Sequence, residues 1–212
     1  MNKAILALGA LLLLSACTDK VAEQGHEMSF EIPTEYTEID NSGEITVNGE
    51  KAEISWEKLR VWDTLSDVIL DTRADYFDQV STTSLSDFSG YKLIETVPSL
   101  DTPVCTMQTK QLEFAASEFP NISFIVISND TPFALQRFCA ANSINNLEVL
   151  SDARTREFGT QNGLLLTDYS LLTRSIMIVD ENNVIQYIQY ANEVTSELDL
   201  MNNALAFLNT LQ

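Results

Sequence analysis

One cysteine of this chain stands where the local structure would make it reactive. Cys105 closes the stretch PSLDTPVC (98–105), which follows an apolar, strand-like run and opens a helix-like pattern. Thr102 suits the helix N-cap, because its hydroxyl can accept a backbone N–H that has no helical partner, and Pro103 suits the first helical position. Cys105 then falls in the first turn, where the partial positive charge of the helix N-terminus favours a thiolate over a thiol. Such a thiolate would be a nucleophile, although position alone leaves a buried, inert cysteine equally open.

The chain has 3 cysteines, and Cys17 has a different context. It ends the stretch MNKAILALGALLLLSAC (1–17), in which the charged Lys3 precedes an apolar run and small residues. This is the layout of a secretory signal, and the run is too short for a transmembrane helix. Its end, LSAC, resembles the lipobox of bacterial lipoproteins, whose signal is cleaved before a cysteine that then carries lipid. We therefore predict a signal peptide over residues 1–16, a lipid anchor on Cys17, and export to the periplasmic side of a bacterial membrane. The alternative is an ordinary signal with a chance cysteine.

Residues 17–40 are predicted to be the lipidated cysteine followed by a flexible, acidic tether. The stretch has several glutamates and few apolar residues, so burial cannot offset the entropy of ordering it. The only histidine of the chain, His26, lies there without a cluster of carboxylates or thiols around it. It is therefore interpreted as a solvated linker residue and not as a metal ligand. Residues 41–212 are predicted to form one domain with its own core.

The charge of the chain excludes some partners. The formal net charge is −19 at pH 7, and a surface of this sign repels phosphate groups. We therefore expect no nucleic acid partner, and contact with a membrane only through the lipid anchor.

The predicted domain alternates strands and helices. An Asn-Gly pair at 48–49, between two alternating segments, predicts a β-hairpin. A weaker strand signal lies near 68–70. After it, apolar runs and helical spacing predict a strand over 91–97, a helix over 103–118, a strand over 122–128, a helix over 132–142, a strand over 147–150, a short helix over 154–163, strands over 175–179 and 184–190, and a helix over 196–211. This order predicts an α/β chain with a thioredoxin-like fold: a mixed central sheet flanked by helices, with an N-terminal β-hairpin.

Several motifs give the cysteine a family context. Pro98, Thr102 and Cys105 match the P-x-x-x-T-x-x-C signature of peroxiredoxins, and PSLDTPVCTMQTK resembles the thiol peroxidase subfamily of atypical two-Cys enzymes. The segment ISNDTPFALQRFCAA is similar to the subfamily's second-cysteine segment and places Cys139 at the spacing of its resolving cysteine. The stretches LSDARTREFG and RSIMIVDENNVI are also similar to the family. The resemblance covers roughly residues 43–212.

The resemblance implies a role for each matching residue. Cys105 would be the peroxidatic nucleophile, which attacks the peroxide O–O bond and becomes a sulfenic acid. Thr102 would orient thiolate and peroxide, Arg174 would donate hydrogen bonds to both, and Pro98 would shield the pocket from water. Cys139 would form an intramolecular disulfide with Cys105. The implied substrates are hydrogen peroxide and small alkyl hydroperoxides, the implied reductant is a thioredoxin-like dithiol, and no metal, haem or flavin is implied.

Two segments depart from the family. Its usual A-P-D-F tetrapeptide has no clear match, and the sequence TLSDV (64–68) stands in about that place. The segment from Gly163 to Arg174 is shorter than the family's loop, which affects the contact that family homodimers use. A homodimer is therefore left open.

Other functions stay open beside the peroxidase. An exported thiol–disulfide oxidoreductase would usually show C-x-x-C, whereas Gln108 stands three residues after Cys105. A degenerate lipoprotein that only binds a partner would keep cysteines inert to peroxide. A permanent structural disulfide between Cys105 and Cys139 is a further alternative, because an exported compartment permits it. Arg174 could also be a salt-bridge residue at the start of a strand.

Overall fold

A computed structural model describes residues 33–75, 77, 79–196 and 200–211. The predicted signal peptide, Cys17 and His26 lie outside the described residues. The helices are α1 (Pro103–Glu118), α2 (Pro132–Asn142), α3 (Glu157–Gln161) and α4 (Met201–Asn209). The strands are β1 (Thr46–Val47), β2 (Glu50–Lys51), β3 (Leu70–Thr72), β4 (Thr82–Thr83), β5 (Lys92–Thr96), β6 (Ser123–Ser128), β7 (Glu148–Ser151), β8 (Leu165–Leu166), β9 (Leu171–Leu172), β10 (Ser175–Val179) and β11 (Ile185–Tyr190).

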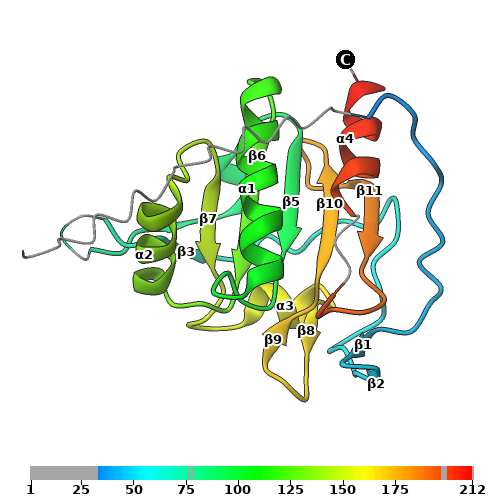
Figure 1. The fold of residues 1–212 in the computed structure, drawn as a ribbon, viewed down its shortest axis with the longest axis horizontal. Coiled ribbons are helices and arrows are strands. Elements are labelled where there is room, and N and C mark those ends of the chain that lie inside the picture. The colour runs from blue at the N-terminus through cyan, green and yellow to red at the C-terminus, as the bar shows by residue number, and fades with distance from the viewer. Residues whose placement is uncertain (1–32, 76, 78, 197–199, 212) are drawn as a thin grey trace, which may run out of the picture.

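A seven-stranded mixed sheet forms the centre, in the order β11-β10-β5-β6-β7-β3-β4. Strands β5, β6 and β7 are parallel neighbours, and each step between them passes through one helix, α1 and then α2. Because such crossovers are right-handed and both steps run in the same direction across the sheet, α1 and α2 lie on one face (Figure 1). The predicted mixed sheet with flanking helices is confirmed.

Successive residues of the central strands enter two different cores. In β6, Phe124 and Val126 belong to the core beneath α1, α2 and α4, whereas Ile125 and Ile127 belong to the core on the opposite face. All four side chains are almost fully buried. This explains why the central strands read as continuous apolar runs without alternation.

Antiparallel strands complete the sheet on both sides. β10 pairs with β5 and with β11, and the turn between β10 and β11 is the one predicted at residues 180–183. The register shifts after Ile178, where Gln186 is the extra residue of a bulge. β3 and β4 add the other edge. The strand predicted near 68–70 is therefore confirmed two residues later, while β4 was not predicted.

Two short hairpins lie outside the central sheet. The Asn-Gly hairpin is confirmed as β1–β2, with positive φ at Asn48 and Gly49, although its strands are shorter than the alternating pattern suggested. The second hairpin, β8–β9, falls within the 163–174 segment and was not predicted from the sequence.

Part of the predicted tether contacts the domain. Residues 33–40 have no regular secondary structure, yet the Thr37 backbone and the Asn203 side chain exchange two hydrogen bonds. The Tyr36 ring packs edge-on against Phe207 of α4 and Tyr187 of β11. Residues 33–40 thus contact the domain through hydrogen bonds and aromatic rings, whereas residues 17–32 of the predicted tether lie outside the described residues.

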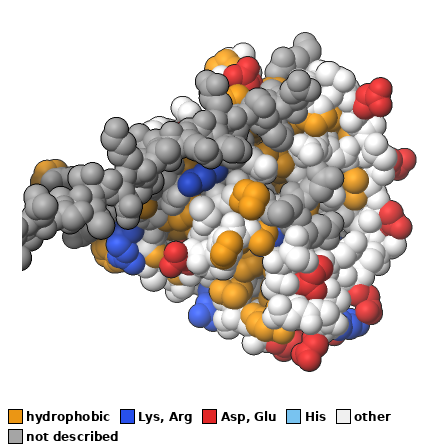
Figure 2. All heavy atoms as spheres, viewed as in Figure 1, with side chains coloured by type: hydrophobic (Ala, Val, Ile, Leu, Met, Phe, Trp, Pro, Cys, Tyr) orange, Lys and Arg blue, Asp and Glu red, His pale blue; other side chains and the backbone are white. Residues whose placement is uncertain are grey.

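The surface agrees with the acidic composition. On the face shown in Figure 2, Asp and Glu side chains are spread along the margin, and hydrophobic side chains gather near the middle. Large exposed hydrophobic residues include Met107 and Phe114 of α1 and Phe133 of α2. Among the residues that the structure describes, no helix is both long enough and apolar enough to span a bilayer.

Candidate active site

The start of α1 has the geometry that its sequence predicts. Thr102 is extended, with φ −121° and ψ 147°, and Pro103 is the first helical residue. The Thr102 hydroxyl oxygen accepts from the Cys105 backbone N at 3.4 Å and donates to the Ser99 carbonyl at 3.2 Å. This places the Cys105 side chain at the first turn of the helix, where it is fully buried.

Arg174 lies against that sulfur. Its Nη2 donates to Sγ of Cys105 at 3.2 Å, although the two residues are far apart in sequence. Both cysteines of the described chain, Cys105 and Cys139, are free thiols. The contact is a hydrogen bond from a permanent cation directly to the sulfur.

Two further contacts hold the guanidinium in place. Nε of Arg174 donates to the Val194 carbonyl at 2.9 Å, and Nη1 donates to Oε1 of Gln108, one turn after Cys105 on α1. Arg174 itself is only 2% exposed. A planar group held at three nitrogens has a single orientation, so its position relative to the sulfur is set before any substrate arrives.

A cavity of about 460 Å³ opens beside this arginine. Pro98, Thr102 and Arg174 line it together with Pro103, Val104 and other mostly apolar side chains. Ser99 also lines it, and the remaining lining residues come from three separate segments: Val47, Leu166, Tyr169, Leu171, Val194 and Thr195. The cavity thus combines a few polar side chains, Thr102 and Arg174 among them, with a mostly apolar lining.

One carboxylate ties the β1–β2 hairpin to the wall of this cavity. Glu193 accepts from the backbone N–H groups of Asn48 and Gly49, at 3.1 and 2.8 Å, and from the Thr46 hydroxyl at 2.9 Å. Desolvation raises the pKa of Glu193, but hydrogen bonds from Thr195, Gly49 and Thr46 outweigh it and lower the pKa to about 2. The hairpin is therefore fixed where Val47 can form part of the wall.

A second carboxylate, Asp130, holds the loop that carries the active-site motif. It follows β6, and its side chain accepts from the Leu100 backbone N at 2.7 Å and from the hydroxyls of Ser99 and Ser128 at 2.8 and 2.9 Å. Because Thr131 caps α2 one residue later, the same short stretch connects the two cysteine-bearing helices. The sequence motif containing Asp130 was noticed, but its link to residues 99–100 depends on the parallel pairing of β5 with β6.

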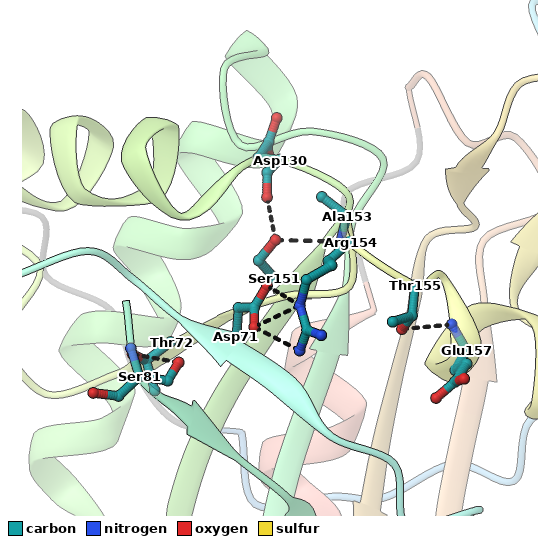
Figure 3. Close-up of polar contacts among 9 residues, drawn as sticks. All are labelled: Asp71, Thr72, Ser81, Asp130, Ser151, Ala153, Arg154, Thr155 and Glu157. Atoms are coloured by element: carbon teal, nitrogen blue, oxygen red, sulfur yellow. Dashed lines mark hydrogen bonds and ion pairs between the residues drawn. The ribbon is translucent and has the colours of Figure 1, made fainter. Parts of the chain in front are cut away.

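A residue at the end of β7 is hydrogen-bonded to the backbone of Asp130. Figure 3 shows Ser151 between Asp130 and Ala153: its hydroxyl donates to the Asp130 carbonyl at 2.6 Å and accepts from the Ala153 backbone N at 3.2 Å. Arg154 reaches in the other direction and forms a two-pronged ion pair with the nearly buried Asp71 of β3. These contacts fix the LSDAR segment, which the sequence showed as family-like.

Cys139 lies in α2, with its side chain 2% exposed. It belongs to the same apolar core as Cys105. Burial raises the pKa of the Cys139 thiol, while nearby Arg73 acts in the opposite direction. A raised pKa makes this thiol a poorer nucleophile at neutral pH.

The structure thus brings most of the predicted site together. Pro98, Thr102 and Arg174 line one cavity. Cys105 is fully buried and is hydrogen-bonded to Thr102 through its backbone N and to Arg174 through its sulfur. Cys139, on a different helix, shares the apolar core of Cys105. The sequence did not reveal Gln108, Asp130 and Glu193 as supporting residues, because each acts through a contact with a distant segment.

Comparisons with known proteins place this arrangement in a family. The Redoxin family matches residues 69–205. The thiol peroxidase of Oceanobacillus iheyensis is 41% identical over 123 residues, which make up 58% of this chain and 75% of that protein. The thiol peroxidase of Streptococcus agalactiae serotype V is 36% identical over 155 residues, 73% of this chain and 92% of that protein.

A solved structure agrees in fold. The peroxiredoxin-like protein from Aquifex aeolicus aligns with a TM-score of 0.67 and 28% identity, over 79% of this chain and 98% of its own. The region that the Redoxin family matches includes the central sheet, the helix that begins at Pro103 and the strand that follows Arg174. The chain therefore belongs to the redoxin family and, within it, to the thiol peroxidases, which are thiol-dependent peroxidase enzymes of the peroxiredoxin group.

Proposed function

We propose that Cys105 is the peroxidatic cysteine and that it reduces hydrogen peroxide and small alkyl hydroperoxides. The observation that carries this proposal is the 3.2 Å contact from Arg174 to the Cys105 sulfur at a helix N-terminus beside a cavity. The thiolate attacks one peroxide oxygen, so that an S–O bond forms and the O–O bond breaks. The leaving alkoxide or hydroxide takes up a proton and departs as alcohol or water, and the sulfur becomes a sulfenic acid.

The polar residues that line the cavity suit this step. Arg174 can donate to the peroxide oxygens as well as to sulfur, because three of its five N–H groups already hold it in place and two remain. Thr102 and Pro98 line the same cavity; Thr102 would orient the peroxide, and Pro98 would shield it from water. The apolar walls favour an alkyl group on the peroxide, and Val47, Leu166 and Leu171 would contact it.

Cys139 completes the cycle in this proposal. Its thiol condenses with the sulfenic acid, an S–S bond forms and water leaves. A thioredoxin-like dithiol then reduces the disulfide and becomes a disulfide itself. No metal, haem or flavin takes part in these steps.

We also propose that the protein acts at a membrane. The support is the LSAC sequence at the end of the apolar N-terminal run. Lipid on Cys17 would hold the domain at the periplasmic side of a bacterial membrane, and residues 18–32 would separate the domain from the lipid surface.

The two cysteine variants test the assignment. Cys105→Ser should abolish sulfenic acid formation, because a serine hydroxyl is almost wholly protonated at neutral pH. Cys139→Ser should form the sulfenic acid at nearly the normal rate and then accumulate sulfinic acid under excess peroxide, since nothing resolves it. Intact mass with a dimedone-type trap measures both products. Rapid peroxide consumption by Cys105→Ser would contradict the proposal and point to Cys139 as the reacting thiol.

A further inference from the structure

A buried carboxyl group lies on the same face of the sheet as Arg174. In β5, Glu95 pairs with Ile176 of β10, and Arg174 is two residues before Ile176 in that register. Side chains two residues apart along a strand point to the same face, so Glu95 and Arg174 are diagonal neighbours. Long side chains reach across such a diagonal.

The described surroundings of Glu95 are mostly apolar. Glu95 is 3% exposed, and within the described chain its Oε2 is buried without a hydrogen-bond partner. Val126 of β6 pairs beside it and is apolar, as are the buried residues that α4 contributes to this core. Among described residues, Arg174, just before β10, is the charged group that acts on Glu95. The same core holds the titratable side chains of Cys105 on α1, Cys139 on α2 and Tyr187 on β11. Burial raises the pKa of Glu95 to about 7, even though the charge of Arg174 lowers it.

The buried Arg174 thus contacts the Cys105 sulfur and is the diagonal neighbour of Glu95, and each of these two groups can become an anion. Arg174 stays positive in both redox states. While Cys105 is a thiolate, that sulfur neutralises Arg174, and a second buried anion would lack a partner. After oxidation the sulfur is neutral, and Arg174 would be left uncompensated.

We propose that Glu95 alternates with the Cys105 sulfur as the counter-charge of Arg174, neutral in the reduced thiolate form and ionised after oxidation. This rests on the proposed role of Cys105 as the nucleophile. The balanced step is thiolate, hydroperoxide and protonated Glu95 giving sulfenic acid, alcohol and ionised Glu95. The alcohol gains as many protons as the carboxyl group loses, and the site keeps one cation and one anion throughout. Glu95 does not touch substrate in this scheme; it acts through Arg174.

Proton counting tests the proposal. The full chain carrying Cys17→Ser and Cys139→Ser has Cys105 as its only thiol. Reduced protein is mixed with one equivalent of alkyl hydroperoxide near pH 7, in weak buffer with an indicator dye, and sulfenic acid is measured by trapping and mass. We expect almost no net proton uptake in this parent, and uptake of roughly one proton per sulfenic acid after Glu95→Gln, because solvent must then protonate the alkoxide. Glu118→Gln, at an exposed glutamate of α1, should behave as the parent.

Infrared difference spectra give a second readout that needs no variant. Oxidation of the parent should remove one buried carboxylic-acid carbonyl band, and Glu95→Gln should lack this change. Sulfenic acid formed with the same proton uptake in the parent and in Glu95→Gln, or without a carboxylic-acid band change in the parent, overturns the proposal. A parent that forms no sulfenic acid overturns the assignment of Cys105 itself, so the two failures are distinguishable.

Discussion

Arg174 is the residue on which the site converges. It contacts the sulfur, the Gln108 side chain and the Val194 carbonyl, and it is almost fully buried. The sequence left open that Arg174 is a salt-bridge residue at the start of a strand. In the structure it stands just before β10 and contacts Cys105 at the start of α1, where a planar, permanently charged group can hold several partners at once.

Arg174→Lys should slow sulfenic acid formation while leaving the fold intact. Lysine keeps the charge but cannot hold the sulfur, Gln108 and Val194 together, and a lost charge-assisted hydrogen bond of about 1.5 kcal/mol or more corresponds to a rate loss of about tenfold or more. Rapid mixing with a sulfenic acid trap measures the step. Arg154→Lys, at the ion pair with Asp71 away from the cavity, is the matched control and should keep the normal rate. An unchanged rate in Arg174→Lys would contradict the role of the planar group.

Glu95 predicts an unusual dependence of stability on pH. Its pKa in the folded protein, about 7, is raised above the ordinary 4.5 by burial, so the folded state holds this proton more tightly than the unfolded chain. The stabilisation is therefore complete below pH 4.5 and is lost as pH rises through about 7. Each unit of pKa difference corresponds to about 1.4 kcal/mol, so wild type should lose about 3 kcal/mol of unfolding free energy relative to Glu95→Gln across this range. Urea unfolding of the reduced proteins at several pH values checks this; parallel stability curves would rule it out.

At the scale of elements, the sequence predicted best what local pattern decides. The Thr102 and Thr131 caps, the helices they begin and the strands buried on both faces follow from hydrogen-bonding needs and apolar runs. The β8–β9 hairpin could not be predicted, because strands of two residues carry no periodicity. The contacts of Glu95 and Asp130 could not be predicted either, since they depend on which strands pair and in which register.

The two cysteine helices should loosen when the disulfide forms. Cys105 is in the first turn of α1 and Cys139 is well inside α2, whose last turn is closed by the Ile144 N–H donating to the Cys139 carbonyl at 3.0 Å. A disulfide needs Cα atoms within about 7 Å and must take the Cys105 sulfur away from Arg174. We expect faster hydrogen exchange over 102–108 and 136–142 in the oxidised form. Equal protection of both segments in the two redox states would show that closure needs no unwinding.

At the scale of the molecule, the central sheet positions both the loop that begins α1 and the core that contains the two cysteines. The loop that carries Thr102 follows β5 and is bonded to Asp130 after β6, while the core beneath the helices contains both cysteines. The acidic surface leaves the domain without an attraction to anionic lipid. In the proposed arrangement, the membrane contact would come from lipid on Cys17.

Cys17→Ser should release the protein from the membrane fraction and leave its peroxidase activity unchanged. Each buried methylene of an acyl chain contributes about 0.8 kcal/mol, so several chains anchor a protein without any protein–lipid contact. Fractionation of cells that express either form measures the distribution. Cys17→Ser that remains with the membranes would argue against the lipid anchor.

Peroxide stoichiometry in a stopped-flow experiment tests whether Cys105 and Cys139 reduce peroxide together. Reduced protein is mixed with limiting alkyl hydroperoxide, and peroxide loss, free thiols and intact mass are followed together. We predict fast consumption of the peroxide, with one Cys105–Cys139 disulfide formed for each peroxide reduced, and no fast phase in Cys105→Ser. Two thiols that stay reduced in the presence of peroxide, or that form a disulfide only with protein substrates, would contradict a peroxidase role for Cys105 and Cys139.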